Sequence, residues 1–428
     1  MTKTVKEPLL HLVKRTDSNP KRAWLIRISA FVVSILLCAI ITVAATGESM
    51  GFFFKYFFQG IFGSKLQVWD ALREIAILLL LALAVTPCFK MKFWNIGGEG
   101  QVLMGALGCA VVTYFAGGKL SDAGTIILAF MLSLVFGMAW AVIPALFKAK
   151  WNTNETLLTL MMNYIATCIV SFFIKKVLPN GTGDMSFSKG VIPPIGGNEY
   201  ILTIIIVVVI TVLMAIYLKY SKHGYELTVV GESPNTARYI GINSKKVIIR
   251  TLLLCGLLCG LAGFILVSVK NHAIKETAVG GKGFTAVLVS WLAHFNPLAM
   301  ALTSFLVVFI TSGASEVGTY GRLGTSYPSV MTGIFFLCII ATEFFINYKV
   351  VFKHSLNLPK NRLKLAMATT PEYSAGANAQ DESQAAENRC QDAQNDAQCA
   401  DTIADDQEAC DIKADDVDTV QSAEEEEK

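Results

Sequence analysis

Charged residues are scarce in this sequence. Asp, Glu, Lys and Arg make up 16% of its 428 residues, against 53% for hydrophobic types. Soluble globular domains carry about 25% charged residues, so the composition excludes an ordinary water-soluble enzyme. The abundance of apolar residues also excludes a chain that is disordered over most of its length.

The sequence also lacks the spacings that mark common catalytic and metal sites. Its ten cysteines include no CxxC pair, and its five histidines form no HExxH motif. No stretch fits G-x-x-x-x-G-K-[ST], the loop that cradles nucleotide phosphates. Cys255 and Cys259 share a helix face, where small apolar filler is the expected role. We therefore expect no metal, no bound cofactor and no catalytic residues in this chain.

What the sequence has instead is a series of long apolar runs. A helix needs about 20 apolar residues to cross a bilayer core. The first run follows a long polar leader and precedes many others, so we interpret it as a retained helix and not as a signal peptide. The fold class that follows is all-α: a polytopic helical membrane protein with about ten transmembrane spans. The runs are Ile28–Ala45, Ile75–Phe89, Gln101–Phe115, Ile126–Phe147, Leu157–Ile174, Ile201–Leu218, Leu252–Val269, Phe284–Ala293, Met300–Ser312 and Val330–Ile346.

The Lys and Arg residues indicate how these spans are oriented. With the N-terminus inside, the cytoplasmic segments hold 21 of them and the external loops hold 11, a bias in the sense of the positive-inside rule. Because they lie between apolar runs, they fit membrane flanks better than a nucleic-acid surface. We expect residues 1–23 and 351–428 to be cytoplasmic, residues 24–350 to form the membrane domain, and residues 175–199 to be external.

Two further segments do not fit the pattern of spans. Residues 47–74 are aromatic, broken by glycine and partly amphipathic, which predicts an interfacial helix on the external side. The chain from residue 369 onward carries 18 acidic and 3 basic residues and few apolar ones. This composition predicts a disordered, acidic, solvated tail.

Two glycine-rich tetrads open apolar runs in the two halves of the sequence. Gly97-Gly-Glu-Gly100 precedes the third run, and Gly280-Gly-Lys-Gly283 precedes the eighth. Five spans separate the tetrads, so the two copies enter the membrane from opposite sides. Paired glycine-interrupted helices of this kind are typical of inverted repeats in transporters, where they lie at the solute pathway. The tetrads therefore predict such a repeat.

Several polar side chains are expected at membrane depth, near these tetrads or within the runs. An ionisable group inside a span usually faces protein or water. Hydrogen bonding between helices is one interpretation of these residues, and a lining for a polar solute is the other. The candidates for the solute pathway are Asn95, Glu99, Gln101, Asn154, Asn163 and His294.

The largest predicted cytoplasmic loop, residues 219–247, contains signals for a short helix. Ser233 is a good N-cap, Pro234 suits the first helical position and Gly241 supplies a stop. Two turns of helix are marginal on their own. Packing or a partner must therefore hold this helix in place.

Ordered motifs make the chain resemble a known family. Residues 224–227, 230–234 and 237–242 of the loop resemble the cytoplasmic loop of ABC importer permeases. These belong to the binding-protein-dependent type that serves ribose, branched-chain amino acids and nucleosides. The resemblance covers roughly residues 24–350. Motifs that resemble its nucleoside branch, which is linked to basic membrane proteins, are FWNIGGEGQ (93–101), Asn154-Glu155, MNYIA (162–166), LAG (261–263), Gly283-Phe284 and Asn296-Pro297.

The resemblance implies a division of labour between subunits in a bacterial cytoplasmic membrane. An external solute-binding lipoprotein captures the solute, two permease subunits form the path through the lipid, and separate ATPase subunits hydrolyse ATP. Two-permease systems are common in this branch, so a heterodimer is expected. The short helix would be the coupling helix that rests on the ATPase. Its residues are Ser233, Pro234, Ala237, Arg238, Tyr239 and Gly241.

The resemblance implies a nucleoside as the solute, with riboflavin and a simple sugar as alternatives. Thr285 departs from the pattern, since relatives often have an acidic residue there. Two other classes are an ion-coupled secondary carrier and a membrane scaffold that recruits partners through the acidic tail. The coupling-helix signature argues against the carrier, and the ordered motifs argue against the scaffold.

Overall fold

The computed structural model describes residues 10–14, 20–178, 183–188, 190–193 and 198–352. The chain divides into two units. The first, Met1–Thr16 with Asn347–Lys428, contains an antiparallel pair of strands, β1 (Leu10–Lys14) and β4 (Tyr348–Phe352). The predicted acidic tail from residue 369 lies outside the described residues.

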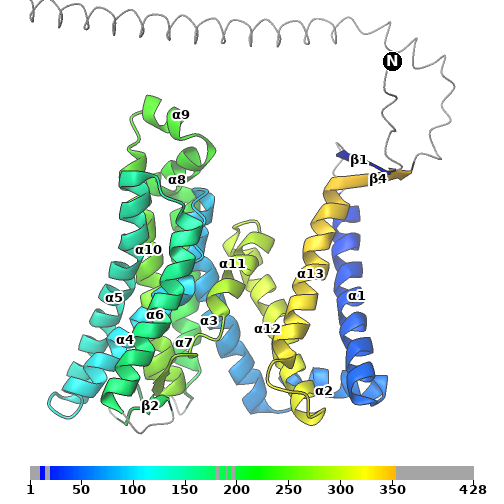
Figure 1. Ribbon diagram of the computed structural model, residues 1–428, viewed down its shortest axis with the longest axis horizontal. Coiled ribbons are helices and arrows are strands. Elements are labelled where there is room, and N and C mark those ends of the chain that lie inside the picture. The colour runs from blue at the N-terminus through cyan, green and yellow to red at the C-terminus, as the bar shows by residue number, and fades with distance from the viewer. Residues whose placement is uncertain (1–9, 15–19, 179–182, 189, 194–197, 353–428) are drawn as a thin grey trace, which may run out of the picture. The chain divides into compact units, whose positions relative to one another are not determined.

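In the part of it that the structure describes, the second unit, Asp17–Ile346, consists of helices together with a short antiparallel pair of strands (Figure 1). Many helices begin at a Ser or Asn, such as Ser121 or Asn154, whose side chain accepts a hydrogen bond from the first turn. The elements are α1 (Pro20–Thr46), α2 (Met50–Phe62), α3 (Lys65–Lys90), α4 (Gly98–Ala116), α5 (Asp122–Trp151), α6 (Glu155–Val177), β2 (Asp184–Ser186), α7 (Ile201–Tyr220), α8 (Lys222–Glu232), α9 (Pro234–Tyr239), α10 (Ser244–Phe264), the π-helix η1 (Ile265–Asn271), β3 (Ala273–Lys275), α11 (Lys282–Leu292), α12 (Pro297–Tyr320) and α13 (Tyr327–Asn347).

Within the described ranges, nine helices are long and apolar enough to cross a membrane. They match nine of the ten predicted runs. The remaining run, Phe284–Ala293, is the eighth and forms the helix α11, whose 11 residues extend only about 16 Å at 1.5 Å per residue. The prediction of a full span is wrong there, because a bilayer core is about 30 Å thick. The preceding chain turns at Gly280 and Gly281, both with positive φ. The helix therefore begins only after this turn, at Lys282.

The predicted interfacial helix of residues 47–74 is also shorter than expected. It corresponds to α2, which ends at Phe62 and packs Phe57 against Phe309 of α12. Residues 65–74 instead form the first turns of α3. Three of their charged side chains are paired, since Arg73 contacts Asp70 and Glu74 contacts Lys270 and Lys282. This pairing allows an amphipathic segment to continue into a span.

The interior of the second unit is formed by α3, α4 and α10. More than three quarters of the most apolar window of each is buried, against 22% for α1, α5 and α7. Small residues let α4, α5 and α10 approach closely. Ser133 donates from its Oγ to the carbonyl oxygens of Gly105 (2.8 Å) and Gly260 (2.7 Å). Such small-residue contacts are typical of helices packed within a membrane.

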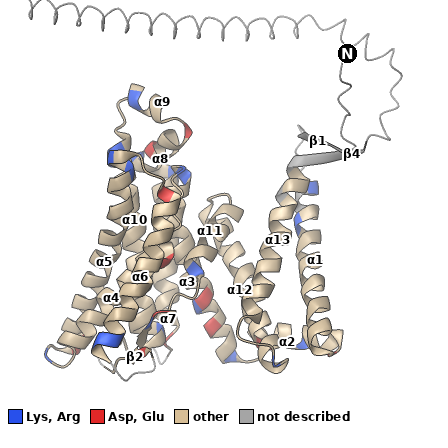
Figure 2. Cartoon of the chain, viewed as in Figure 1, with Lys and Arg blue, Asp and Glu red and all other residues tan. Residues whose placement is uncertain are grey.

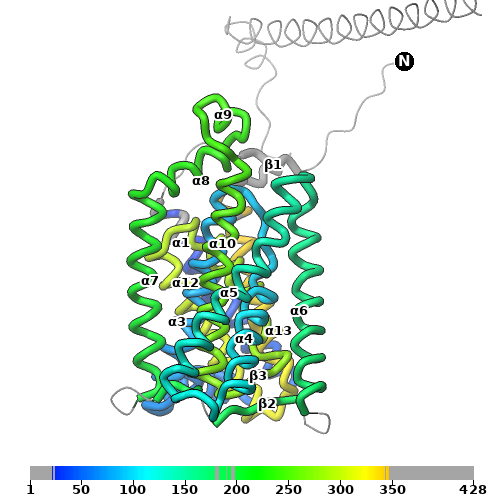
Figure 3. The backbone as a smooth tube through the Cα atoms, turned by 90° about the vertical axis from the view of Figure 1, so that its left-hand side faces the viewer, coloured from blue at the N-terminus to red at the C-terminus, as the bar shows by residue number. Residues whose placement is uncertain are grey.

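Many charged residues of this unit lie toward its two ends, and a few others lie on and beside α3 between them (Figure 2). One end carries α8 and α9 together with the start of α1 and the end of α13, and the other carries α2 and the β2–β3 pair (Figure 1). Helices α6 and α7 flank the unit on opposite sides, and α8 and α9 extend beyond α10 (Figure 3). A mainly uncharged middle band is expected where helices face lipid.

Candidate functional site

Helices α4 and α11 begin against each other, which places the two glycine tetrads at one junction. A Cβ added at Gly283 would lie 2.4 Å from the backbone nitrogen of Glu99, so only glycine fits. From this junction the two helices run toward opposite ends of the unit (Figure 1). The arrangement has the form expected of an inverted repeat, in which interrupted helices meet inside the membrane.

The carboxylate of Glu99 satisfies the free N-terminus of α11. Its two oxygens accept hydrogen bonds from the backbone nitrogens of Gly281 and Gly283, each at 2.8 Å. The helix has no capping side chain of its own. A carboxylate at this position compensates both the unpaired N–H groups and the positive end of the helix dipole. Glu99 therefore acts as a cap supplied by another helix.

The N-terminus of α4 is capped in the same way, by Asn163 of α6. Its Oδ1 accepts from the backbone nitrogen of Gly100 at 2.8 Å, and its Nδ2 donates to the carbonyl oxygen of Ile96 at 2.9 Å. Thr159, one turn earlier, accepts from the nitrogen of Ile96 at 3.2 Å. Helix α6 thus holds the loop that leads into α4.

Asn95 and Gln101 form a buried polar network beside this loop. Asn95 accepts from the nitrogen of Gly97 (3.0 Å) and donates to Cys255 Sγ (3.3 Å), whose thiol donates to Gln101 Oε1 (3.3 Å). Both amides are at most 1% exposed. Their hydrogen-bonding groups face protein, which is the arrangement that stabilises polar side chains at this depth.

Two short helices, α8 and α9, form the region predicted to carry the coupling helix. Ser233 Oγ accepts from the nitrogen of Thr236 at 3.3 Å, and Pro234 occupies the first helical position. Ala237 is fully buried, whereas Tyr239 is 92% exposed. Gly241 ends the turn with a φ of +80°, so local sequence signals set both ends of this helix.

An ion pair ties α8 to the first part of α10. Arg250 Nη2 donates to Glu226 Oε2 at 2.8 Å, and His223 lies 3.6 Å from the same oxygen. The hydrogen bond from Arg250 holds the pKa of Glu226 below its usual range. The pair therefore links α8 directly to α10.

Comparison with known proteins identifies the family. The family model described as "Branched-chain amino acid transport system / permease component" matches residues 68–340. The chain belongs to this family. The permease is therefore a multi-pass membrane protein and a transporter subunit.

Three relatives span most of the permease. The glucose ABC transporter permease protein TsgB13 of Haloferax volcanii is 27% identical over 303 residues, covering 67% of the permease and 79% of the relative. The guanosine ABC transporter permease protein NupP of Bacillus subtilis is 26% identical over 336 residues, covering 76% and 94%. The nucleoside ABC transporter permease protein NupB of Lactococcus lactis is 26% identical over 347 residues, covering 77% and 93%.

Four of the six residues that the sequence suggests for the solute pathway lie at the junction of α4 and α11. Asn95, Glu99, Gln101 and Asn163 all contact the starts of α4 or α11, as described above. Asn154 lies apart, at the N-terminus of α6. There its Oδ1 caps the helix by accepting from the backbone nitrogen of Leu157 at 3.2 Å. His294 follows α11 and lies 3.3 Å from Arg27 Nη2. The candidates therefore occupy three separate places.

Sequence reasoning missed a cluster of charges beside the junction. Glu74 of α3 contacts Lys270 of η1 and lies 2.7 Å from Lys282, the first residue of α11. Its side chain is 16% exposed, so the permease buries a carboxylate between two ammonium groups. The available signal was a single Glu at the edge of an apolar run, together with the Lys inside the second tetrad.

Proposed function

We propose that the permease is the transmembrane subunit of an ATP-driven importer for nucleosides. The family membership and the nucleoside and guanosine permeases among the relatives support this proposal. The observation that favours an uncharged solute over an amino acid is the capped junction of α4 and α11, and the choice of a nucleoside among uncharged solutes rests on the relatives. Interrupted helices that meet inside a membrane usually mark the place where a transporter handles its solute.

The chemistry of the junction favours an uncharged solute. A free helix N-terminus binds anions, including the carboxylate of an amino acid. Here Glu99 already fills the N-terminus of α11, and the Oδ1 of Asn163 fills that of α4. An amino acid carboxylate would compete with Glu99 at close range and be repelled by it. A neutral, hydroxylated nucleoside avoids this repulsion and can hydrogen-bond to carboxylate and amide groups.

The partners follow from the same proposal. A separate ATPase would dock on α9, where Arg238 and Tyr239 are exposed, since Arg and Tyr are common anchors of interfaces. A second, different permease subunit would complete the path. An extracytoplasmic solute-binding lipoprotein would deliver the nucleoside at the end of the unit that carries α2 and β2. The host membrane would be a bacterial cytoplasmic membrane.

A simple sugar is the second candidate, because one relative is named as a glucose permease. A sugar is also neutral and hydroxylated, so the capped junction accommodates it equally. Riboflavin is neutral as well. An ion-coupled carrier is disfavoured, because ATP-driven permeases account for the exposed α9 and a carrier does not.

Uptake by the reconstituted complex tests this proposal. Proteoliposomes containing the permease and its partner subunits are expected to import labelled guanosine or uridine with ATP, in preference to glucose, riboflavin and leucine. Arg238→Glu reverses a charge on α9 and is expected to lower ATP hydrolysis and uptake together, at least tenfold. Lys245→Glu, an equally exposed basic residue outside α9, is the matched control. Full uptake without an ATPase would refute the ATP-driven mechanism, and preference for glucose would refute the solute.

A further inference from the structure

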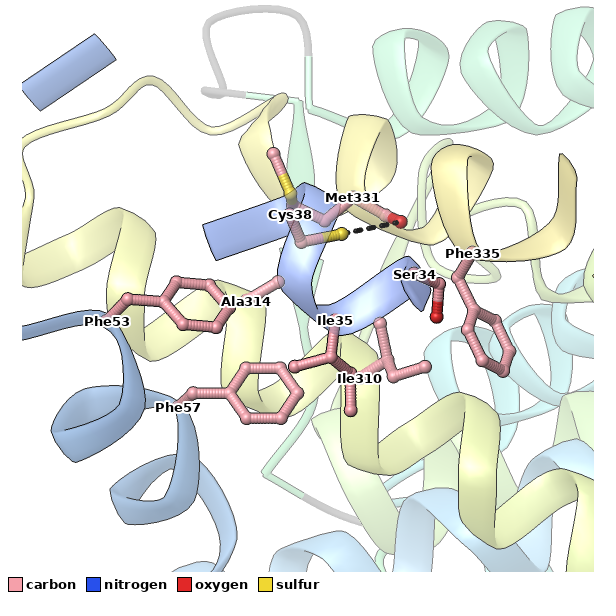
Figure 4. Close-up of a pocket in the computed structure, with 9 residues that line it drawn as sticks. All are labelled: Ser34, Ile35, Cys38, Phe53, Phe57, Ile310, Ala314, Met331 and Phe335. Atoms are coloured by element: carbon pink, nitrogen blue, oxygen red, sulfur yellow. Dashed lines mark hydrogen bonds between the residues drawn. The ribbon is translucent and has the colours of Figure 1, made fainter. Parts of the chain in front are cut away.

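Mainly apolar side chains close the place where α1, α2, α12 and α13 meet. There Phe53, Phe57 and Ile310 lie around one small void (Figure 4). The void measures only ≈ 10 Å³, about the least that can hold a single water. Helices joined in this way cannot separate locally without enlarging the void, which loses packing contacts. A contact that opens and closes during transport needs a different construction.

The contact of α3 with η1 and the start of α11 has such a construction, because it is made through long charged side chains. One carboxylate oxygen of Glu74 accepts from the ammonium group of Lys270 in η1. Its other oxygen lies 2.7 Å from Lys282 Nζ, at the first residue of α11. A single carboxylate on α3 thus joins two other segments. Long side chains can change rotamer and part while the backbones behind them stay packed.

The three charged side chains are not sealed from their surroundings. Their exposed fractions are 16% for Glu74, 17% for Lys270 and 27% for Lys282. Charged groups at membrane depth almost always face the protein interior or a water-filled cavity, since facing lipid is costly. A buried ion pair also seldom stabilises a fold more than apolar side chains of the same volume would. Stability alone therefore does not account for the cluster, and its exposed part indicates a hydrated space beside the junction.

The cluster lies between the junction of α4 and α11 and the end of the unit that carries α2 and β2. Lys282 belongs to the turn whose backbone N–H groups bind Glu99. Lys270 lies three residues before β3, which pairs with β2 at the α2 end (Figure 1). A solute that enters from that end meets the cluster before it reaches the junction.

The chain between Lys270 and Lys282 has a hinge-like backbone at each end. Lys270 belongs to the π-helix η1, a form that is rare and frequent at functional sites. His272 follows with a φ of +48°, and the turn before Lys282 contains Gly280 at +63° and Gly281 at +78°. A few residues at the ends of elements are enough to absorb the backbone rotation of a moving segment. The start of α11 can therefore shift without unwinding its neighbours.

We propose that this cluster is a gate on the solute path, closed in the present arrangement by the contact of Glu74 with Lys282. Separation of Lys282 from Glu74 opens the way between the α2 end and the junction, and water replaces the lost partner of each charge. Lys270 stays with Glu74 and keeps the carboxylate in position to bind Lys282 again. The gate rests on the proposed function, because it requires a solute path at the junction.

Cross-linking in the complete reconstituted complex tests whether this contact opens. In a background whose native cysteines are replaced by alanine, Glu74→Cys and Lys282→Cys are combined and treated with a short bis-methanethiosulfonate reagent, whose bonds to the thiols are cleaved by a reductant. Mass spectrometry follows the cross-link in the nucleotide-free complex and in the complex trapped with ATP and vanadate. We expect different rates in the two states, since the gate opens and closes within the ATP cycle. Equal rates would overturn the proposal.

Uptake of guanosine is then measured before and after the cross-link is reduced. We expect uptake to fall in proportion to the cross-linked fraction and to return on reduction. The matched control combines Gln67→Cys with Glu316→Cys, which joins α3 to α12 where the two side chains lie 3.4 Å apart, outside the cluster. Its cross-link should leave uptake unchanged. Loss of uptake with both pairs of cysteines, or with neither, would overturn the gate.

Two further outcomes separate the gate from other roles of the cluster. Protection of Glu74→Cys with Lys282→Cys from the reagent by guanosine, without any nucleotide, would overturn the gate and make the cluster a solute-binding site. If the unaltered complex imports no guanosine with ATP, the proposed function fails and the gate fails with it. If the complex imports guanosine and the cross-link has no effect, only the gate fails.

Discussion

Two backbone N–H groups at the start of α11, those of Gly281 and Gly283, donate to one carboxylate, that of Glu99. Glu99→Ala removes both acceptors, and each unpaired group costs about 1–3 kcal/mol when buried. We expect a lower unfolding temperature for the purified permease and reduced uptake. Glu99→Gln keeps one acceptor oxygen, so its unfolding temperature should lie between those of Glu99→Ala and the unaltered permease. The thermal unfolding of each variant in detergent, together with nucleoside uptake, measures the effect.

Glu276→Ala is the matched control for Glu99. It removes an exposed carboxylate that lies five residues before Gly281. Water can replace the contacts of an exposed carboxylate. If Glu99→Ala and Glu276→Ala unfold at the same temperature, the carboxylate of Glu99 does not hold α11. Loss of uptake without loss of stability would instead indicate a direct contact between Glu99 and the solute.

The pair of Glu226 and Arg250 predicts a pH dependence of stability. Because the hydrogen bond from Arg250 lowers the pKa of Glu226 in the folded state, the pair stabilises the fold above the ordinary Glu pKa of about 4.3. That stabilisation is lost as the pH falls through the lowered value. The unfolding temperature of Glu226→Gln should therefore lie below that of the unaltered permease at pH 7, and the difference should shrink below about pH 4. A difference that stays constant with pH, or an equal effect of Glu232→Gln on the same helix, would contradict this account.

At the level of single residues, the sequence indicates which side chains matter better than it indicates their partners. Glu99 and Asn163 stand out as polar groups beside or within apolar runs. Their acceptors and donors could not be predicted, since the Glu99 bonds join residues more than 180 positions apart. Glu74 was missed because its compensating lysines come from η1 and α11, and no local pattern connects them.

At the level of elements, prediction succeeds where the signals are local. The bounds of α9 follow from Ser233, Pro234 and Gly241, all within nine residues. The length of α11 does not follow from hydropathy, because an apolar run looks the same whether it crosses the membrane or starts halfway. Its start is set by the turn at Gly280 and Gly281 and by the cap that Glu99 supplies from α4.

The close packing of α5 on α10 predicts that one methyl group is enough to disturb it. A Cβ added at Gly137 would lie 2.4 Å from the carbonyl oxygen of Gly256 and 2.8 Å from the Cα of Gly260. Both neighbours are backbone, so neither can rotate away, and overpacking of this kind costs about 1–3 kcal/mol. We expect Gly137→Ala to lower the unfolding temperature of the permease in detergent.

Gly333 in α13 is the matched control for Gly137. No atom lies within 4 Å of a Cβ added there, so alanine meets no obstacle and favours the helix by about 0.5–1 kcal/mol. Gly333→Ala should therefore leave the unfolding temperature unchanged or raise it. If Gly137→Ala and Gly333→Ala destabilised the permease equally, the close approach of α5 to α10 would not be the reason for glycine at position 137.

At the level of the whole molecule, the apolar runs and the basic flanks predict the all-α fold and its direction through the membrane. The shared junction of the two tetrads could not be predicted, since it depends on how α4 and α11 meet in space. The orientation itself is a prediction that the arrangement of helices makes testable. Ser186 in β2 and Asn235 in α9 lie at opposite ends of the helical unit (Figure 1), and both are exposed.

Labelling of single cysteines in intact cells would decide the orientation. In a background whose ten native cysteines are replaced by alanine, Ser186→Cys should react with a membrane-impermeant maleimide from outside. Asn235→Cys should react only after the cells are permeabilised, because α9 is expected in the cytoplasm. The physical basis is the excess of Lys and Arg on the side of α8 and α9, which favours retention of that side in the cytoplasm. The opposite pattern would place α9 outside, where no ATP-hydrolysing subunit can reach Arg238 and Tyr239. That result would refute both the predicted orientation and the proposed coupling of α9 to an ATPase. It would leave the contact between α4 and α11 at Glu99 unaffected.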